Sequence, residues 1–365
     1  MSRPAPRIGY LAESGFQHAF PVEAMLRVAP GPLFTTGERL AARFRGRTEV
    51  VRVAAAGLSA ALAERGVDVL ISSSHLLPPR LLRERAPALR VVFVSHGESD
   101  KTHGQGPCPQ PSWQAMPVNL EFDLALVASH DHLRTQVNPQ KELVGYLKHD
   151  LFAHGGYGAR MPEPGWVLWA PGWGRHSAVG TWLEDVVEAT GRLGLRCLLH
   201  FHPHSFTTEP HLVQRAQALV LRHEHLRLAQ CFNLLELMAR CELMLGDVSS
   251  VTHDWLMFDR PVVFLDHPGL CFPEEKRLFH VGRVVRPREA LSRALGEELS
   301  EPTRGSAARR QALAERYHRL DGRAAERALE AILRRWRGSW ADPQAGRRPA
   351  EEVDSVGLGG EKAGS

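Results

Sequence analysis

Cysteine is scarce in this sequence and is not spaced like a structural framework. The five cysteines are scattered over 365 residues, and no two of them form a C-x-x-C pair. A disulfide framework needs an even set of cysteines, and a zinc knuckle needs closely spaced ones. The sequence therefore predicts neither a disulfide-stabilised protein nor a zinc-binding module.

Long apolar runs are missing as well. No segment approaches the ~20 apolar residues of a membrane-spanning helix, and the opening stretch MSRPAPRIGYLAESG lacks the apolar core of a signal peptide. We expect a cytoplasmic protein, with peripheral contact at the inner face of the cell membrane as an open alternative. The net charge of +4 reflects arginines spread over the whole length, which suits anionic substrates or an anionic membrane face.

Common signatures of nucleotide and nucleic-acid binding are also absent. The sequence has neither a G-x-G-x-x-G turn nor a G-x-x-x-x-G-K-[ST] loop, so dinucleotide reduction and P-loop hydrolysis lose their main support. Basic and aromatic residues are not interleaved in a patch, which argues against RNA or DNA as a partner.

What the sequence does contain is an alternation of short apolar strands with helical stretches. Apolar runs without polar alternation are typical of strands buried on both faces, and hence of a parallel sheet covered by helices. Because the pattern occurs twice, we predict an α/β fold of two Rossmann-like domains whose parallel sheets face a cleft. The predicted strands are residues 7–12, 49–53, 67–72, 90–95 and 123–128, then 166–170, 196–200, 226–229, 242–245 and 262–265, with 281–285 as a further candidate.

The boundary between these domains is marked by glycine and proline. Segment 154–164 contains HGGYG and two prolines, which predicts a hinge between domain 1–153 and domain 165–337. The second domain is expected to end in one long helix from Ala307 to Trp336. The tail 338–365 is polar and glycine-rich, so we expect it to be disordered.

The segment GDVSSVTHDWLMFDRPVVFLD, residues 246–266, reads as a turn and a short helix between two buried strands. Ser249 and Ser250 stand where the helix begins. Serines there either cap the helix or, with the free backbone N–H groups, form a seat for an anion such as phosphate. The turn alone leaves both interpretations open.

Histidines follow two other strands. In VVFVSHGESDK, the apolar run stops at His96, whose near-neutral pKa suits a general base, and Gly97 permits close approach of another group. In LLHFHPHSF, His200, His202 and His204 alternate and could hold a metal, but Pro203 and the lack of a nearby carboxylate favour a single functional histidine. Either group could also be purely structural.

In a fourth stretch, WVLWAPGWGRH, the predicted strand ends before Pro171 and a loop follows. Trp173 could pack on a ring or a sugar, and Arg175 could bind a phosphate through two parallel hydrogen bonds. Ordinary surface packing is the alternative for both residues.

These four stretches, in this order, resemble the glycerophosphotransferases that use CDP-glycerol to build teichoic acid and capsule polymers. That family carries W-H-G-T-P-x-K, Y-A-P-T-W-R, R-x-H-P and S-D-Y-S-S-V-x-x-D segments, the last followed by K-P-I-I-F. Here SHGESDK, WAPGWGR, HFHP and GDVSSVTHDWLMFDRPVVF are similar to them. The last match is the most specific and places Asp247, Ser249, Ser250, Val251, Asp254 and Pro261 in register.

The resemblance implies a two-domain glycosyltransferase fold of the GT-B type, a nucleotide-diphosphate donor such as a CDP-alcohol, and no metal or other cofactor. The implied acceptor is a polyol phosphate or a glycan, with lipid linkage left open. His96 and His202 match the family's two functional histidines. The implied donor- and phosphate-binding residues are Gly97, Lys101, Pro171, Trp173, Arg175, Asp247, Ser249, Ser250 and Asp254.

Several positions depart from the family pattern. Ser95 stands for its tryptophan, Glu98 and Ser99 for its threonine and proline, and His200 for the arginine of R-x-H-P. Because these changes lie at strand ends near the expected cleft, two alternatives stay open. One is a nucleotide-sugar transferase or UDP-N-acetylglucosamine 2-epimerase with the same fold. The other is an inactive relative that only binds a nucleotide.

Overall fold

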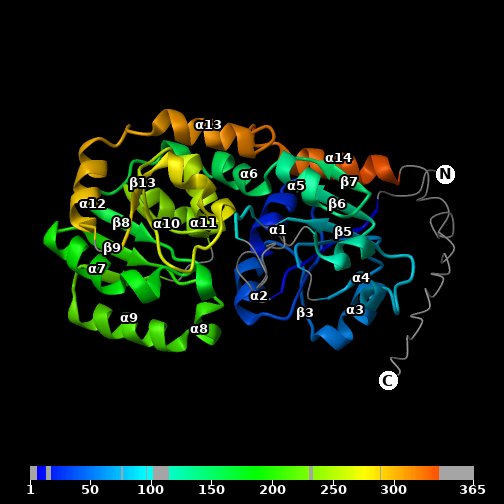
Figure 1. Cartoon of the computed structure of the whole chain (residues 1–365). Coiled ribbons are helices and arrows are strands. Elements are labelled where there is room, and N and C mark those ends of the chain that lie inside the picture. Colours follow the sequence, from blue (N-terminus) through cyan, green and yellow to red (C-terminus); the bar gives the residue numbers. More distant parts are fainter. Residues whose placement is uncertain are drawn as a thin grey trace, which may run out of the picture.

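The computed structural model describes residues 6–13, 18–74, 77–95, 97–101, 115–229, 233–287 and 289–336. These residues form two β-sheets with helices packed around them, side by side in the molecule (Figure 1). Every strand pairing in both sheets is parallel. The predicted fold class, two α/β units with parallel sheets, is confirmed.

The first sheet has seven strands in the order β3-β2-β1-β4-β5-β6-β7. Sheets of this kind bind ligands beyond the carboxyl ends of the strands, where the strand order reverses. Here that point lies between β1 and β4, beside β5. The strands are β1 (Ile8–Leu11), β2 (Leu33–Thr35), β3 (Val50–Arg52), β4 (Val69–Ser72), β5 (Arg90–Val94), β6 (Leu124–Val127) and β7 (Lys141–Leu143).

The second sheet has six strands in the order β10-β9-β8-β11-β12-β13, so its order reverses between β8 and β11. These two strands lead into the predicted WAPGWGR and GDVSS segments. The strands are β8 (Trp166–Trp169), β9 (Arg196–Leu199), β10 (Leu226–Leu228), β11 (Leu243–Gly246), β12 (Val262–Leu265) and β13 (Arg283–Val285).

Helices connect the strands, and in the described part of the chain none has the length and apolar character needed to cross a membrane. Around the first sheet lie α1 (Ala19–Met25), α2 (Glu38–Phe44), α3 (Leu58–Glu64), α4 (Pro79–Leu82), α5 (His130–Thr135) and α6 (Leu147–His154). Around the second lie α7 (Val179–Arg192), α8 (Ser205–Thr208), α9 (Pro210–Arg222), α10 (Leu234–Arg240), α11 (Ser250–Trp255) and α12 (Leu291–Ser300).

The end of the described chain differs from the prediction. Instead of one long helix it forms α13 (Ser306–Arg316) and α14 (Ala324–Arg335), and α14 packs on α6 and α1 of the first unit (Figure 1). The first helix ends where Tyr317 has an extended backbone (φ −106°, ψ 143°), and in the segment that follows Arg319 and Gly322 have left-handed conformations with φ of 46° and 71°. The carboxylate of Asp150 then accepts hydrogen bonds from the backbone N–H groups of Ala324 and Ala325, at 3.0 and 2.7 Å. The predicted tail 338–365 lies outside the described residues.

A shared apolar core joins the two units. The largest cluster of contacting buried side chains includes Tyr10 and Leu126 from the first sheet, Leu168 and Phe264 from the second, and Ala328 from α14. Two smaller clusters lie within the second and first units respectively. The loops that follow β5 and β11 are therefore brought together. A hinge at 154–164, and the boundaries drawn from it, stay predictions.

Candidate active site

The turn after β11 presents buried polar atoms that have no hydrogen-bond partner among the described residues. Ser249 is the N-cap of α11, with an extended backbone (φ −149°, ψ 161°), but its side chain makes no capping hydrogen bond. Its Oγ is buried, as is Oδ1 of Asp247, and within the described residues neither atom has a hydrogen-bond partner. Buried polar atoms are normally satisfied by protein, water or ligand. The structure therefore does not support the helix-capping interpretation of Ser249.

Asp247 ties this turn to the loop that follows β8. Its Oδ2 accepts hydrogen bonds from the backbone N–H groups of Gly172 at 2.6 Å and Ala178 at 3.3 Å. Burial raises the pKa of Asp247 to about 6, although Lys101 and these N–H groups act in the opposite direction. A Cβ at Gly172 would lie 3.1 Å from the carbonyl oxygen of His176 and 3.4 Å from both carboxylate oxygens of Asp247, so glycine after the buried Pro171 suits this crowded turn.

A cation and aromatic rings gather beside Asp247. Nζ of Lys101 lies 5.6 Å from the centroid of the Trp173 ring, within range of a cation–π contact. Trp173 stacks on His202 at 5.8 Å and contacts His204 at 4.8 Å. Burial lowers the pKa of Lys101 to about 8, although Asp247 and Glu209 act to raise it. The predicted residues Lys101, Trp173, His202 and Asp247 thus lie in one cluster.

The hydrogen bond made by His202 fixes the role of its ring nitrogens. Nδ1 of His202 lies 3.2 Å from the backbone N–H of His204 and accepts its hydrogen. A neutral imidazole with Nδ1 as acceptor carries its proton on Nε2. His202 in this form is a hydrogen-bond donor through Nε2, which suits contact with a phosphate oxygen.

The three alternating histidines do not converge. Nδ1 of His200 hydrogen-bonds to the carbonyl of Ala229 at 2.9 Å, whereas His202 and His204 stack on each other at 5.2 Å. Within the described ranges, no group of three or more His, Cys, Asp or Glu side chains is arranged to hold a metal ion.

Arg175 is held by a neighbouring loop. Its guanidinium donates to the carbonyl of Gly269 at 2.8 Å and forms an ion pair with Glu275. The ring of His176 contacts the same carboxylate at 3.0 Å. Burial lowers the pKa of His176 to about 4. Glu275 lines a small cavity that Asp247 and Ser249 also line. Arg175 therefore contacts a residue that lines the predicted phosphate site.

The loop after β5 reaches α11 of the second unit. A side chain at Gly97 would come within 3.2 Å of Cβ of Ser250, which shows how closely the two segments approach. Glycine at this position therefore allows the first unit to meet the start of α11. His96, predicted as the general base, lies outside the described residues.

Asp254 has a different environment from the one the sequence predicts. Its carboxylate is buried and accepts hydrogen bonds from the hydroxyl of Tyr146 and from Nζ of Lys148, both at 2.6 Å. Tyr146 in turn stacks on Tyr317 at 4.5 Å. Both carboxylate oxygens are thus engaged across the two units, and the residue acts as an interdomain anchor in this structure.

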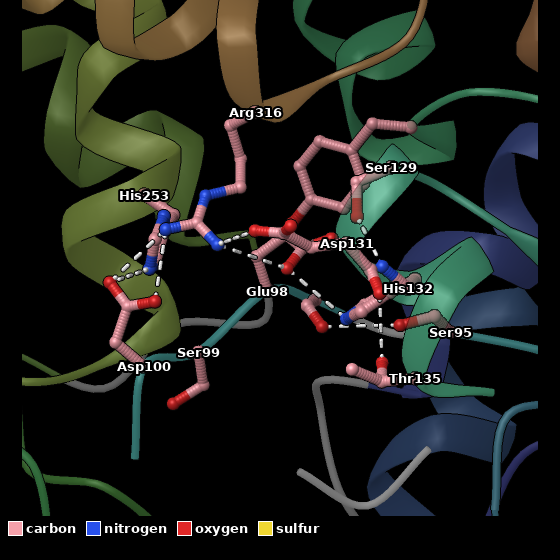
Figure 2. Close-up of polar contacts among 12 residues, drawn as sticks. Ser95, Glu98, Ser99, Asp100, Ser129, Asp131, His132, Thr135, His253 and Arg316 are labelled. Atoms are coloured by element: carbon pink, nitrogen blue, oxygen red, sulfur yellow. Dashed lines mark hydrogen bonds and ion pairs between the residues drawn. The ribbon is translucent and has the colours of Figure 1, made fainter. Parts of the chain in front are cut away.

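A group of buried charged residues surrounds the loop that follows β5 and includes residues 97–101, which we call the β5 loop. The sequence did not predict this group. Figure 2 shows acidic side chains of the loop pointing toward basic side chains from α5, α11 and α13. The family pattern drew attention to the histidine and lysine of SHGESDK and not to the acids between them. The group consists of Glu98, Asp100, His132, His253 and Arg316, and we call it the loop network.

Comparisons with known proteins relate the chain to one sequence family and to several solved structures. Residues 166–334 match the sequence model of the family CDP-Glycerol:Poly(glycerophosphate) glycerophosphotransferase. A search of the curated proteins gives no match.

Solved structures share the fold over most of the chain. The wall teichoic acid polymerase TagF is 13% identical, with a TM-score of 0.63 and coverage of 92% of this chain and 90% of that one. A UDP-N-acetylglucosamine 2-epimerase from Listeria monocytogenes is 12% identical, with a TM-score of 0.62 and coverage of 92% and 97%. MurG from Acinetobacter baumannii is 11% identical, with a TM-score of 0.51 and coverage of 90% and 100%.

At such low identity the structural likeness shows the two-domain glycosyltransferase fold and nothing finer. The match to the family model is more specific, because it spans the second unit from β8 to α14 and includes the turn with Asp247, Ser249 and Ser250. Over this unit the chain is therefore similar to the CDP-glycerol:poly(glycerophosphate) glycerophosphotransferase family.

Proposed function

We propose that the protein transfers glycerol phosphate, or a similar polyol phosphate, from a CDP-activated donor to an acceptor hydroxyl during synthesis of a cell-envelope polymer. One observation carries the proposal. The domain that matches the family contains, directly after β11, the buried hydroxyl of Ser249, which has no hydrogen-bond partner among the described residues. Lys101, Trp173 and His202 surround the same turn, which makes it suited to a phosphate-bearing donor.

In the proposed reaction, the acceptor oxygen attacks the β-phosphorus of the donor. The new bond joins this oxygen to phosphorus, and the bond from the β-phosphorus to the bridging oxygen breaks, so CMP leaves with the bonding electrons. The proton of the acceptor hydroxyl passes to a base, for which we propose His96 on the family resemblance. The products are CMP and an acceptor extended by one polyol phosphate.

Three residues are proposed to stabilise the negative charge on the phosphates. Lys101 supplies a positive charge, His202 donates through Nε2, and the hydroxyl of Ser249 donates a hydrogen bond. Donors held in place before the reaction stabilise developing charge more effectively than water does. Asp247 positions the turn through Gly172 rather than contacting phosphate, because a carboxylate would repel it.

We propose that the domain 1–153 faces the acceptor and the domain 165–337 holds the donor, with residues 154–164 as the hinge between them. The acceptor is proposed to be a polyol phosphate or glycan linked to a lipid. The protein would then work at the inner face of the membrane, and co-sedimentation with anionic vesicles tests this part separately.

Isothermal titration calorimetry with CMP, CDP-glycerol, CDP-ribitol, UDP and UDP-N-acetylglucosamine tests the donor assignment. The proposal expects the cytidine nucleotides to bind most tightly. Tighter binding of UDP-N-acetylglucosamine would favour a sugar transferase or an epimerase. Binding without release of CMP in the presence of acceptors would favour an inactive relative.

A further inference from the structure

The β5 loop carries two buried acids that face in different directions. Glu98 is 2% exposed, and its Oε2 lies 3.1 Å from Nε2 of His132 on α5. Asp100 lies 3.3 Å from Nε2 of His253 on α11. The loop is therefore attached to the first unit through Glu98 and to the second through Asp100 (Figure 2).

Arg316, the last residue of α13, connects both attachments. Its guanidinium contacts Asp100 at 2.9 and 3.3 Å and Asp131 at 2.9 Å, and it lies 4.0 Å from Glu98. The side chain is only 10% exposed. Burial alone would raise the pKa of Asp100, but His253 and Arg316 hold it at about 2. A guanidinium suits this position because its planar fork binds several carboxylate oxygens at fixed geometry.

The loop network acts close to the donor site. Lys101 directly follows Asp100 in the chain, and its ammonium group interacts with Asp247 and Trp173. His253 also lines the small cavity beside Ser249, and its Nδ1 is buried without a partner among the described residues. The position of Asp100 thus determines how Lys101 and the loop backbone meet the turn after β11.

We propose that Arg316 is a positioning residue for the transfer reaction, because it holds the β5 loop in place and thereby sets Lys101 against the donor phosphates. The inference rests on the proposed function for its kinetic part. Without Arg316, the carboxylates of Glu98, Asp100 and Asp131 lie close together with a buried charge left uncompensated, which is strongly unfavourable. The loop relieves this by moving toward solvent, and Lys101 moves with it.

The test compares Arg316→Gln and Arg316→Lys with two variants of the same helix. Arg310→Gln removes an exposed ion pair with Asp259. Arg309→Gln removes a fully buried arginine whose hydrogen bonds within the described part of the chain go to Asp259 and to the carbonyls of Pro302 and Arg304, away from the β5 loop. Each variant is examined by thermal unfolding, by calorimetry with CMP, by steady-state kinetics with CDP-glycerol, and by hydrogen exchange of residues 97–101.

We expect Arg316→Gln to lower kcat by about 10²-fold, the loss that a displacement of about 1 Å produces, with a much smaller change in CMP affinity. Arg316→Lys should recover part of kcat because the positive charge remains. Backbone amides of residues 97–101 should exchange faster in Arg316→Gln than in either control. Both controls should keep kcat, although Arg309→Gln should unfold at a lower temperature.

Two results would overturn the inference. One is unchanged exchange of residues 97–101 in Arg316→Gln, a measurement that needs no turnover and so stands even if the donor assignment fails. The other is an equal loss of kcat in Arg309→Gln, which would assign the effect to the packing of α13. Absence of CMP binding and turnover in the wild-type protein would contradict the proposed function instead.

Discussion

At the scale of single residues, the site depends on ionisable groups whose pKa values are shifted toward neutrality. Lys101 and Asp247 interact, and burial moves the pKa of the lysine down to about 8 and that of the aspartate up to about 6. Perturbed pairs of this kind are common at functional sites because burial near a ligand shifts both groups. Sequence motifs identified both residues but gave no information about their ionisation.

The shifted pKa of Lys101 predicts how donor use varies with pH. Because only the protonated lysine attracts phosphate, kcat/KM for CDP-glycerol should fall as the pH rises through about 8, the value in the free protein. Lys101→Arg should move this decline to higher pH, since a guanidinium stays protonated. A decline at the same pH in Lys101→Arg would show that another group controls it.

The lowered pKa of Lys101 also makes the stability of the fold depend on pH, and in the opposite direction to donor use. The folded-state pKa of Lys101 lies below its ordinary value of 10.5, so the neutral form is favoured by folding. Its contribution to stability therefore decreases as the pH falls through 10.5 toward 8. Asp247 has a raised pKa, so its contribution decreases as the pH rises from 3.8 through about 6.

At the scale of elements, the start of α11 distinguishes phosphate binding from helix capping. Ser249 makes no side-chain capping bond, so the Ser249→Ala/Ser250→Ala double variant should keep nearly all of its stability. Its affinity for CDP-glycerol should weaken by roughly 1–3 kcal/mol if the hydroxyls bind charged oxygens. Calorimetry and urea unfolding measure the two quantities. A loss of about 1 kcal/mol of stability with unchanged affinity would restore the capping interpretation.

The elements also show where sequence patterns succeed. Buried apolar runs predicted most strands, because a strand covered on both faces needs apolar side chains throughout. The patterns missed β7, whose sequence KEL is half-buried and polar, and the three-residue β2. The start of α14 is capped by Asp150, which lies 174 residues before Ala324 in the chain. Such a distant cap has no local signal.

The candidate site was predictable to a similar degree. Motif residues such as Asp247, Ser249 and Lys101 could be named because their order along the chain resembles a known pattern. The loop network could not, since Asp100 and Arg316 are 216 positions apart and meet only through the packing of both units. Asp254 fits the pattern in sequence, but its position one turn into α11 directs it toward the first unit.

At the scale of the whole molecule, the two units are joined by a buried ion pair between Lys148 of the first unit and Asp254 of the second. Breaking one partner of such a pair typically costs about 3–5 kcal/mol because the other charge remains buried. Asp254→Asn should therefore lower the free energy of unfolding substantially, and the loss should be smaller than additive when combined with Lys148→Met. Urea unfolding measures both. Full stability with loss of CDP-glycerol binding would show instead that Asp254 contacts the donor.

The most direct test of the assigned activity follows both products of the transfer reaction. The purified protein is incubated with CDP-glycerol labelled in the glycerol group and a membrane-extracted polyol-phosphate acceptor, and parallel samples contain UDP-N-acetylglucosamine. We predict equal amounts of free CMP and of label in the acceptor, both dependent on the acceptor, and no conversion of UDP-N-acetylglucosamine. Release of UDP or epimerisation of the sugar, without CMP or labelled polymer, would contradict the assignment.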